Sequence, residues 1–167
     1  MINKNPSIAV LLSAHNGICW IEEQVISILS QRDVSIKIFI SIDRSTDNTF
    51  EWCKNFARKN NNINLLPYGE KFGGAAKNFF RLIRDVDFSY YDYIAFSDQD
   101  DIWDIDKLSH AIKTIKKDDL DAYSSDVIAF WSDGRERLVK KSFPQKKYDY
   151  FFEAAGPGCT YVLKQHS

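Results

Sequence analysis

Four short apolar runs alternate with four amphipathic stretches over the first two thirds of the chain, and this alternation constrains the fold more than any other feature. The strand-like runs cover residues 8–12, 36–40, 63–66 and 93–96. A continuous apolar run suits a strand that is buried on both faces, as in a parallel sheet. The order therefore predicts an α/β, Rossmann-like fold with a mostly parallel sheet flanked by helices.

Between the runs, apolar residues recur at helical spacing. We expect helices around residues 21–29, 50–57, 76–83 and 105–115. Ser45 or Thr46 is the expected N-cap of the second helix, and Asp104 that of the fourth. Cys19 and Cys53 fall on the first two helices, where free thiols are commonly part of the core.

After Asp121 the pattern changes to strands alone. Residues 122–130 are strand-like, Asp133-Gly134 is a hairpin turn signal, and Leu138-Val139 continues the returning strand. We therefore expect an antiparallel hairpin, then a short helix over 148–155 and a strand over 161–163. The basic stretch 135–147 and the aromatic residues after it favour a solvated hairpin followed by core aromatics. Contact with an anionic membrane surface is the alternative.

Composition narrows the class of protein. The 167 residues fit one domain. Basic and acidic residues number 22 and 23, which argues against electrostatic binding of nucleic acid. The three cysteines are far apart in sequence and fit neither a disulfide framework nor a structural zinc site, so a reducing cytoplasm is expected. No apolar run approaches the length of about 20 residues that spans a membrane.

Polar clusters follow three of the expected strands, at residues 13–17, 43–47 and 98–101. Ligands of open parallel sheets bind beyond the carboxyl ends of the strands, so these clusters should converge. Asp98, Asp100 and Asp101 repel one another unless a cation or donors neutralise them. An Asp-x-Asp at a strand end suits Mg²⁺ or Mn²⁺ holding a nucleotide diphosphate. The simpler alternative is a solvated acidic turn that caps the next helix.

Other interpretations of these residues fail on context. An EF-hand loop starting at Asp98 requires Gly at Trp103 and Glu at Ser109. A DDxxD prenyl-diphosphate motif over residues 100–104 belongs to all-helical proteins, and a haloacid-dehalogenase phosphatase carries its Asp-x-Asp after the first strand. Dinucleotide and Walker fingerprints are missing, and the three histidines form no triad. Gly73-Gly74 before a helix, with Lys77 and Arg81 one turn apart, offers a weak phosphate site.

These motifs, in this order, resemble family 2 glycosyltransferases with the GT-A fold. Residues 11–17 are similar to that family's first strand and loop, and residues 40–49 to its "DDGSTDNT" segment. Residues 96–103 match the "SDQDDIW" of a rhamnosyltransferase-like branch, and residues 156–160 are similar to that branch's acceptor-side segment. The resemblance covers about residues 7–164. It implies inverting transfer of a sugar, with rhamnose suggested, from a dTDP- or UDP-sugar to a saccharide or lipid-linked acceptor in cell-surface polysaccharide synthesis.

The resemblance also assigns roles to residues. It implies nucleotide-sugar binding by Ser13, His15, Asp43, Lys77, Asn78 and Asp98. It places the metal ion on Asp100, with Asp98 beside it, and the acceptor side at Asp101, Gly158 and Cys159. Ile42 and Arg44 depart from the family's Asp and Gly, which puts the nucleotide specificity in question.

The resemblance implies a nucleotide-binding half over residues 1–120 and the start of an acceptor-side half over residues 121–167, within a single domain. The family's general base follows the Gly-Cys-Thr segment, so we expect it beyond Ser167, in a longer enzyme. A cytoplasmic location, with peripheral contact at the inner face of the membrane, fits such a role. Three other functions stay open: a nucleotide-sugar-binding fragment without catalysis, a metal-dependent phosphoryl-transfer enzyme, and an interaction module.

Overall fold

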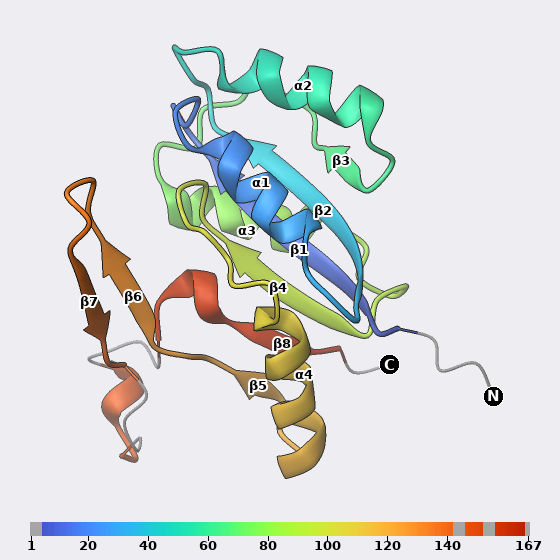
Figure 1. Ribbon diagram of the computed structural model, residues 1–167. Coiled ribbons are helices and arrows are strands. Elements are labelled where there is room, and N and C mark those ends of the chain that lie inside the picture. Colours follow the sequence, from blue (N-terminus) through green and yellow to red (C-terminus); the bar gives the residue numbers. More distant parts are fainter. Residues whose placement is uncertain (1–4, 142–145, 152–155, 166–167) are drawn as a thin grey trace.

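The computed structural model describes residues 5–141, 146–151 and 156–165 (Figure 1). The α-helices are α1 (Ile21–Leu29), α2 (Thr49–Lys59), α3 (Ala75–Asp85) and α4 (Lys107–Asp118). The strands are β1 (Ser7–Ala14), β2 (Ser35–Ile42), β3 (Ile63–Leu65), β4 (Tyr93–Ser97), β5 (Ala122–Tyr123), β6 (Val127–Phe130), β7 (Glu136–Val139) and β8 (Val162–Lys164). Two 3-10 turns are η1 (Asp149–Phe151) and η2 (Gly158–Thr160).

One six-stranded sheet organises the protein, with strand order β3-β2-β1-β4-β8-β5. β1, β2, β3 and β4 run parallel, and β8 pairs antiparallel with both β4 and β5. β1 lies at the centre because its apolar run is buried on both faces. The mostly parallel α/β sheet predicted from the alternation is confirmed.

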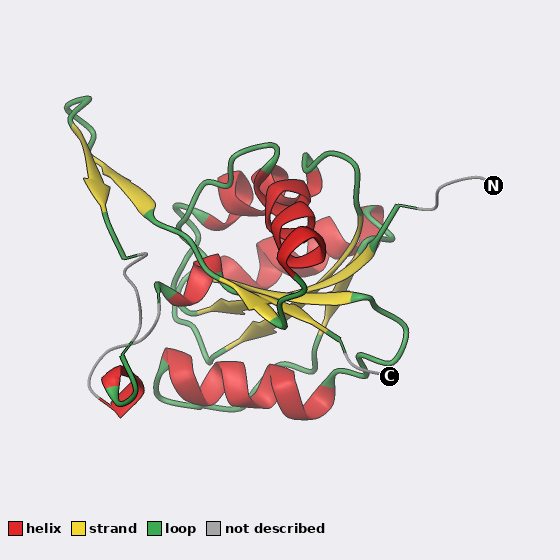
Figure 2. Ribbon diagram, turned by 90° about the horizontal axis from the view of Figure 1, so that it is seen from below, coloured by secondary structure: helices red, strands yellow, loops and turns green. Residues whose placement is uncertain are grey.

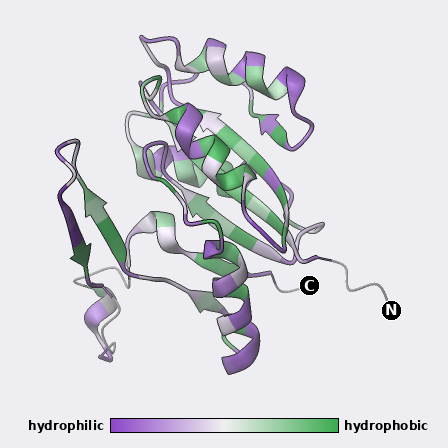
Figure 3. Ribbon diagram, in the orientation of Figure 1, coloured by the Kyte–Doolittle hydropathy of each residue, from purple (hydrophilic) through white to green (hydrophobic). Residues whose placement is uncertain are grey.

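Alternate residues of β1 point to two different cores. Ile8, Val10 and Leu12 join the larger core, which α1 and α4 cover, whereas Ala9 and Leu11 face α3. Figure 2 shows the sheet edge-on between these two helical layers. The central strands β1 and β2 consequently carry a strong hydrophobic colour in Figure 3. Among the described residues, none of the helices combines the length and apolarity that crossing a bilayer requires.

The expected antiparallel hairpin forms between β6 and β7, and Gly134 adopts a positive φ of 83° in its turn. The single strand predicted over residues 122–130 is wrong, because that segment divides between the main sheet and the hairpin. The helix predicted over 148–155 is limited to the short turn η1 in the part that is described. Residues 152–155 lie outside the described residues.

Four local predictions are wrong: the N-caps of α2 and α4, the placement of Cys19, and the core aromatics after the hairpin. α2 is preceded by Asn48 and α4 by Asp106, so neither Ser45, Thr46 nor Asp104 is an N-cap. The Asp47 side chain instead accepts the hydrogen bond from the Thr49 backbone N–H. Cys19 lies in an exposed turn before α1, whereas Cys53 is a core thiol as expected. Tyr148 and Phe151 are exposed rather than part of a core.

Candidate nucleotide-sugar site

Backbone and side-chain hydrogen bonds join the loops after β1 and β2. The Asn16 N–H donates to Ser45 Oγ at 3.1 Å, and the Gly17 N–H donates to Thr49 Oγ1 at 2.8 Å. In the reverse direction, the Thr46 N–H donates to Asn16 Oδ1 at 2.8 Å. Asn16 has a φ of 48°, a conformation that Asn tolerates better than most residues. Two of the three predicted polar clusters are thus brought together.

Gln99 connects the third cluster to the first. Its Oε1 accepts a hydrogen bond from the His15 N–H at 2.7 Å, and its Nε2 donates to the His15 carbonyl at 2.9 Å. A Cβ at Gly17 would overlap the Gln99 carboxamide, so a side chain there would displace Gln99 from its hydrogen bonds to His15. Gln99 lies within the segment that matches "SDQDDIW", but no role was predicted for it, because an uncharged amide between two aspartates does not indicate which group it will bind.

The three clusters surround one hollow of about 560 Å³. Six of the residues proposed for donor or metal binding line it: Ser13, His15, Asp43, Asn78, Asp98 and Asp100. Lys77 is exposed on α3 and is not among the lining residues, whereas Lys71 and the Gly73-Gly74 pair are. The hollow therefore lies beyond the carboxyl ends of β1, β2 and β4, where an open α/β sheet binds ligands.

Asp43 is a fixed hydrogen-bond acceptor in this hollow. Its carboxylate receives the backbone N–H groups of Arg44 at 2.7 Å, Phe72 at 2.8 Å and Gly73 at 2.8 Å. Burial by itself raises the pKa of Asp43, but these three donors outweigh it and hold the pKa below its usual value. Asp43 is therefore an ionised acceptor with a free lone pair for a ligand N–H group.

Asn78 is saturated by the protein itself. Its Nδ2 donates to the Ser41 carbonyl at 2.9 Å and to the Ala14 carbonyl at 3.4 Å, and its Oδ1 accepts from the Ser41 hydroxyl. Only 1% of the side chain is exposed. Asn78 thus holds the ends of β1 and β2 together at the edge of the hollow.

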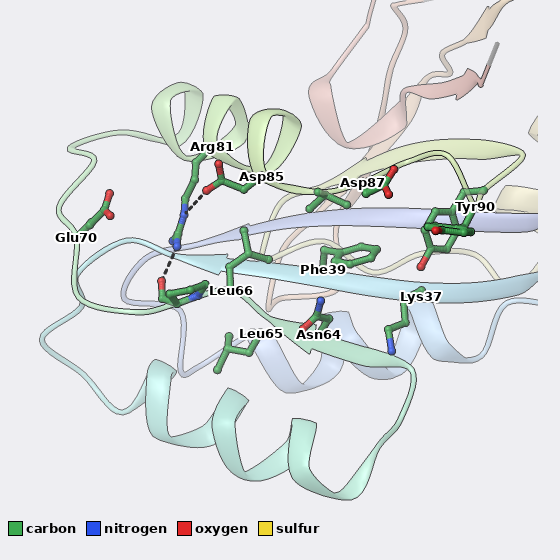
Figure 4. A pocket seen from close by; sticks show the side chains of 13 residues that line it. Lys37, Phe39, Asn64, Leu65, Leu66, Glu70, Arg81, Asp85, Asp87 and Tyr90 are labelled. Atoms are coloured by element: carbon green, nitrogen blue, oxygen red, sulfur yellow. Dashed lines mark hydrogen bonds and ion pairs between the residues drawn. The ribbon is translucent and has the colours of Figure 1, made fainter. Parts of the chain in front are cut away.

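Arg81 does not supply positive charge to this hollow, contrary to expectation. It is 5% exposed, donates to the Pro67 carbonyl at 2.6 Å, and lies near Asp85. Figure 4 shows these contacts at a second hollow of about 700 Å³, between α3 and the edge strand β3. Apart from Arg81, none of the residues predicted for donor, metal or acceptor binding lines that second hollow.

The acidic segment after β4 concentrates negative charge. Burial, followed by repulsion from Asp101 and Asp100, raises the pKa of Asp98 to about 6. Asp101 Oδ2 is buried without a hydrogen-bond partner. Asp100 is exposed at the rim of the hollow. Repelling carboxylates and an orphaned buried oxygen fit a hard divalent cation, which takes oxygen ligands and would relieve both costs.

Cys159 completes a geometric cluster with these acids. Ligand atoms of Asp98, Asp101 and Cys159 lie within 4.8 Å of one another. Burial, and then the charge of Asp101, raises the pKa of the Cys159 thiol to about 12. A protonated thiol is a poor ligand for Mg²⁺ or Mn²⁺, so the carboxylates are the fitting donors here.

Two buried glutamines, Gln24 in α1 and Gln31 just after the end of α1, hold the acidic segment from behind. Gln31 donates to the Asp104 carbonyl at 2.6 Å and accepts the Leu108 N–H at 2.9 Å, at the start of α4. The Gln24 carboxamide lies 2.7 Å from the Ser97 hydroxyl. In the amide orientation that gives both the nitrogen and the oxygen a hydrogen-bond partner, the Gln24 nitrogen donates to the Asp101 carbonyl and the oxygen accepts from the Ser97 hydroxyl. Residues 97–108 are therefore fixed at one end by α1 and at the other by the turn that follows α1.

Comparison with known proteins identifies the class to which this fold and hollow belong. The family model for Glycosyl transferase family 2 matches residues 9–160, so the chain belongs to that family. It is 55% identical over 157 residues to a dTDP-rhamnosyl transferase, RfbG, of Shigella flexneri, covering 93% of this chain and 54% of that protein. It is 29% identical to a putative teichuronic acid biosynthesis glycosyltransferase, TuaG, of Bacillus subtilis, covering 68% of this chain and 43% of that protein.

Solved structures agree on the fold. The TarS 1-349 fragment from S. aureus, crystallised with UDP-GlcNAc, superposes with a TM-score of 0.71 at 17% identity, covering 95% of this chain and 45% of that one. The Pyrobaculum calidifontis mannosyltransferase PcManGT, in complex with GDP-Man and Mn²⁺, gives a TM-score of 0.64 at 17% identity, covering 97% and 45%. The predicted GT-A fold is thereby confirmed. The chain spans about half the length of the curated relatives it matches.

Proposed function

We propose that this protein is the donor-binding part of an inverting glycosyltransferase. The donor is a dTDP- or UDP-sugar, with rhamnose as the sugar, and the acceptor is a saccharide or lipid-linked saccharide of cell-surface polysaccharide synthesis. The observation that carries the proposal is the convergence of Asp43, Asp98 and Asp100 on one hollow in a family 2 chain. The 55% identity to a dTDP-rhamnosyl transferase supports the dTDP-sugar.

In this proposal, Asp43 accepts the N–H of a pyrimidine base. Ser13 and His15 line the nucleotide pocket, Lys77 approaches the nucleotide from α3, and Asn78 fixes the strand ends. Gly73 and Gly74 leave the rim of the hollow free of side chains near the start of α3, where backbone N–H groups favour a phosphate.

Asp100, with Asp98 beside it, would hold Mg²⁺ or Mn²⁺ against the diphosphate. When bound, the cation neutralises the negative charge that develops on the leaving diphosphate. Asp98 would in addition contact the ribose or the sugar. Asp101, Gly158 and Cys159 would form the acceptor side, with Asp101 and Cys159 already adjacent. We further propose that the general base comes from a part of the enzyme outside residues 1–167.

Calorimetric titration with dTDP, UDP and GDP, with and without Mn²⁺, tests the donor site. Metal-dependent binding of dTDP or UDP is expected, and Asp100→Ala should weaken it at least tenfold. Asp104→Ala is the matched control, because Asp104 is an exposed aspartate outside the hollow. If no nucleotide binds, or if Asp104→Ala has the same effect as Asp100→Ala, the proposed donor site is wrong.

We also propose a cytoplasmic enzyme that contacts the inner face of the membrane through the β6–β7 hairpin. One face of this hairpin exposes Ile128, Phe130 and Leu138, each by more than half. Exposed basic residues beside it are Arg135, Arg137, Lys140, Lys146 and Lys147. Apolar side chains flanked by basic ones favour an anionic bilayer surface.

Co-sedimentation with vesicles tests this contact. We expect more protein to sediment with vesicles containing phosphatidylglycerol than with phosphatidylcholine alone, and Leu138→Ser should reduce the bound fraction. Phe80→Ser is the matched control, because Phe80 is an exposed apolar residue on α3. Equal binding to both vesicle types, or no loss with Leu138→Ser, would contradict the membrane contact.

A further inference from the structure

Lys107, the first residue of α4, turns its ammonium group inward. Its Nζ donates a hydrogen bond to the Cys159 carbonyl at 2.6 Å. The same Nζ lies 3.3 Å from the centroid of the Trp103 ring, which is 5% exposed. Burial lowers the pKa of Lys107 to about 7. The side chain thus links two segments that are 52 residues apart in sequence.

The segment that Lys107 reaches is shaped by hydrogen bonds of its own and is joined to β4 by one from the Phe96 N–H to the Tyr161 carbonyl at 3.3 Å. In the η2 turn, the Thr160 N–H and hydroxyl both donate to the Pro157 carbonyl, at 2.9 Å and 2.8 Å. The Gly156 N–H donates to the Tyr161 hydroxyl at 3.1 Å. Cys159 and Thr160 are nevertheless buried, so other parts of the protein pack over the turn.

Removing the ammonium group would leave a specific defect. The Cys159 carbonyl would lose the donor it receives from α4, and an unsatisfied buried acceptor is costly. The Trp103 face would lose a cation, an interaction that is stronger when it is desolvated. The first loss falls on the contact between α4 and η2, and the second on the contact between α4 and the segment that precedes it. Neither Lys107 nor Trp103 lines the hollow beyond β1 and β2.

We propose that Lys107 is a positioning residue that holds the Gly158–Thr160 turn against the acidic segment. The turn carries Cys159, which lies beside Asp98 and Asp101. On the proposed function this turn faces the acceptor, so Lys107 fixes the acceptor-side wall of the site without touching the donor.

The three cysteines give a direct measurement on the chain as it stands. Cys19 is exposed and should react at once with a thiol reagent, whereas Cys53 and Cys159 are buried and react only when the structure opens. Cys53 lies in α2, away from Lys107, and therefore reports global opening. Mass spectrometry after timed labelling separates the rates of the two buried thiols.

In Lys107→Met, which keeps the apolar stem over Trp103, we expect Cys159 to label at least tenfold faster and Cys53 to keep its rate. Lys113→Met is the matched control on the exposed face of α4 and should change neither rate. Unchanged labelling of Cys159, or equal acceleration of Cys53, would overturn the proposal. The first result means that the turn is held without Lys107, and the second that Lys107 supports only global stability.

A second readout separates positioning from donor binding. The dissociation constant for dTDP with Mn²⁺ should stay within twofold of the wild-type value in Lys107→Met. A loss of nucleotide affinity as large as the gain in Cys159 labelling would also contradict the proposal. If the wild-type chain binds no nucleotide, the proposed donor site fails, yet the labelling rates still decide whether Lys107 holds the turn.

Discussion

The side chains at the strand ends differ in how well their roles can be predicted from the sequence. Asp98 and Asp100 are conspicuous because three carboxylates within four residues demand a counter-charge. Gln24, Gln31 and Gln99 carry no such signal, since an amide has neither charge nor apolar periodicity. Their partners are backbone groups or distant hydroxyls, which only the folded chain brings close. The acids of the site were therefore predictable, and the amides that orient them were not.

Replacing Gln99 with alanine should loosen the contact between the acidic segment and the loop after β1. Two hydrogen bonds to the His15 backbone are lost, each contributing about 0.5–1.5 kcal/mol. We expect the free energy of unfolding to fall by about 1–2 kcal/mol and metal-dependent nucleotide binding to weaken. Urea unfolding and calorimetry measure the two effects. Wild-type nucleotide affinity in a destabilised Gln99→Ala protein would show that Gln99 does not position Asp98 or Asp100.

The raised pKa of Asp98 gives a pH dependence with a definite sign. A proton on Asp98 competes with the cation, so Mn²⁺ affinity in the presence of dTDP should fall as the pH drops below about 6. Without metal, stability runs in the opposite direction, because a carboxyl whose folded pKa is raised favours folding at low pH and loses that contribution as the pH rises through about 6.

Titrations at pH 5.0, 6.0 and 7.5 measure this dependence. The Asp98→Asn variant removes the titrating group and should bind Mn²⁺ more weakly, with a smaller change over the same pH range. An identical pH profile in the wild type and in Asp98→Asn would assign the effect to another group.

At the level of elements, α1 and the turn that follows it serve both the core and the acidic segment. Ile21, Val25 and Ile28 pack in the larger core, and Gln24 and Gln31 fix the segment that leads from β4 to α4. This arrangement explains why Asp104 is not the N-cap of α4. The Leu108 N–H, a free donor in the first turn of the helix, is satisfied by Gln31 from another element. Local capping rules cannot anticipate a donor or acceptor supplied across space.

Replacing Gln31 with alanine should therefore cost more than replacing a surface residue of α1. The Leu108 N–H and the Asp104 carbonyl both lose a partner, so we expect a loss of about 1–3 kcal/mol in the free energy of unfolding. Glu23→Ala is the control, because Glu23 is exposed on the neighbouring helix α1 and should change stability by less than about 0.5 kcal/mol. Equal losses in both variants, measured by urea unfolding, would show that Gln31 does not hold α4.

On the scale of the whole molecule, the alternation of strands and helices predicted the sheet well. A strand that is apolar on both sides must lie inside a sheet whose two faces are covered, and the helices between the strands supply that cover. The chain after Asp121 was harder, since a run of apolar residues does not say which sheet it joins. Residues 122–123 extend the main sheet and residues 127–130 leave it for the hairpin, and local sequence alone carries no boundary between them. The molecule thus combines a densely paired sheet with a two-stranded one that stands apart (Figure 1).

Amide hydrogen exchange should be slow in the main sheet and fast in the β6–β7 hairpin. The amides of β1 are paired with β2 on one side and β4 on the other and are buried on both faces, so they should exchange only by global unfolding. β6 and β7 pair only with each other and expose Ile128 and Leu138, and an isolated two-stranded sheet is marginally stable in water. Their amides should exchange at least a hundredfold faster than those of β1. Without vesicles, hairpin amides as well protected as those of β1 would contradict this prediction and would mean that the two-stranded sheet is stable by itself. With anionic vesicles, slower exchange in the hairpin and unchanged exchange in β1 would identify the hairpin as the surface that meets the bilayer.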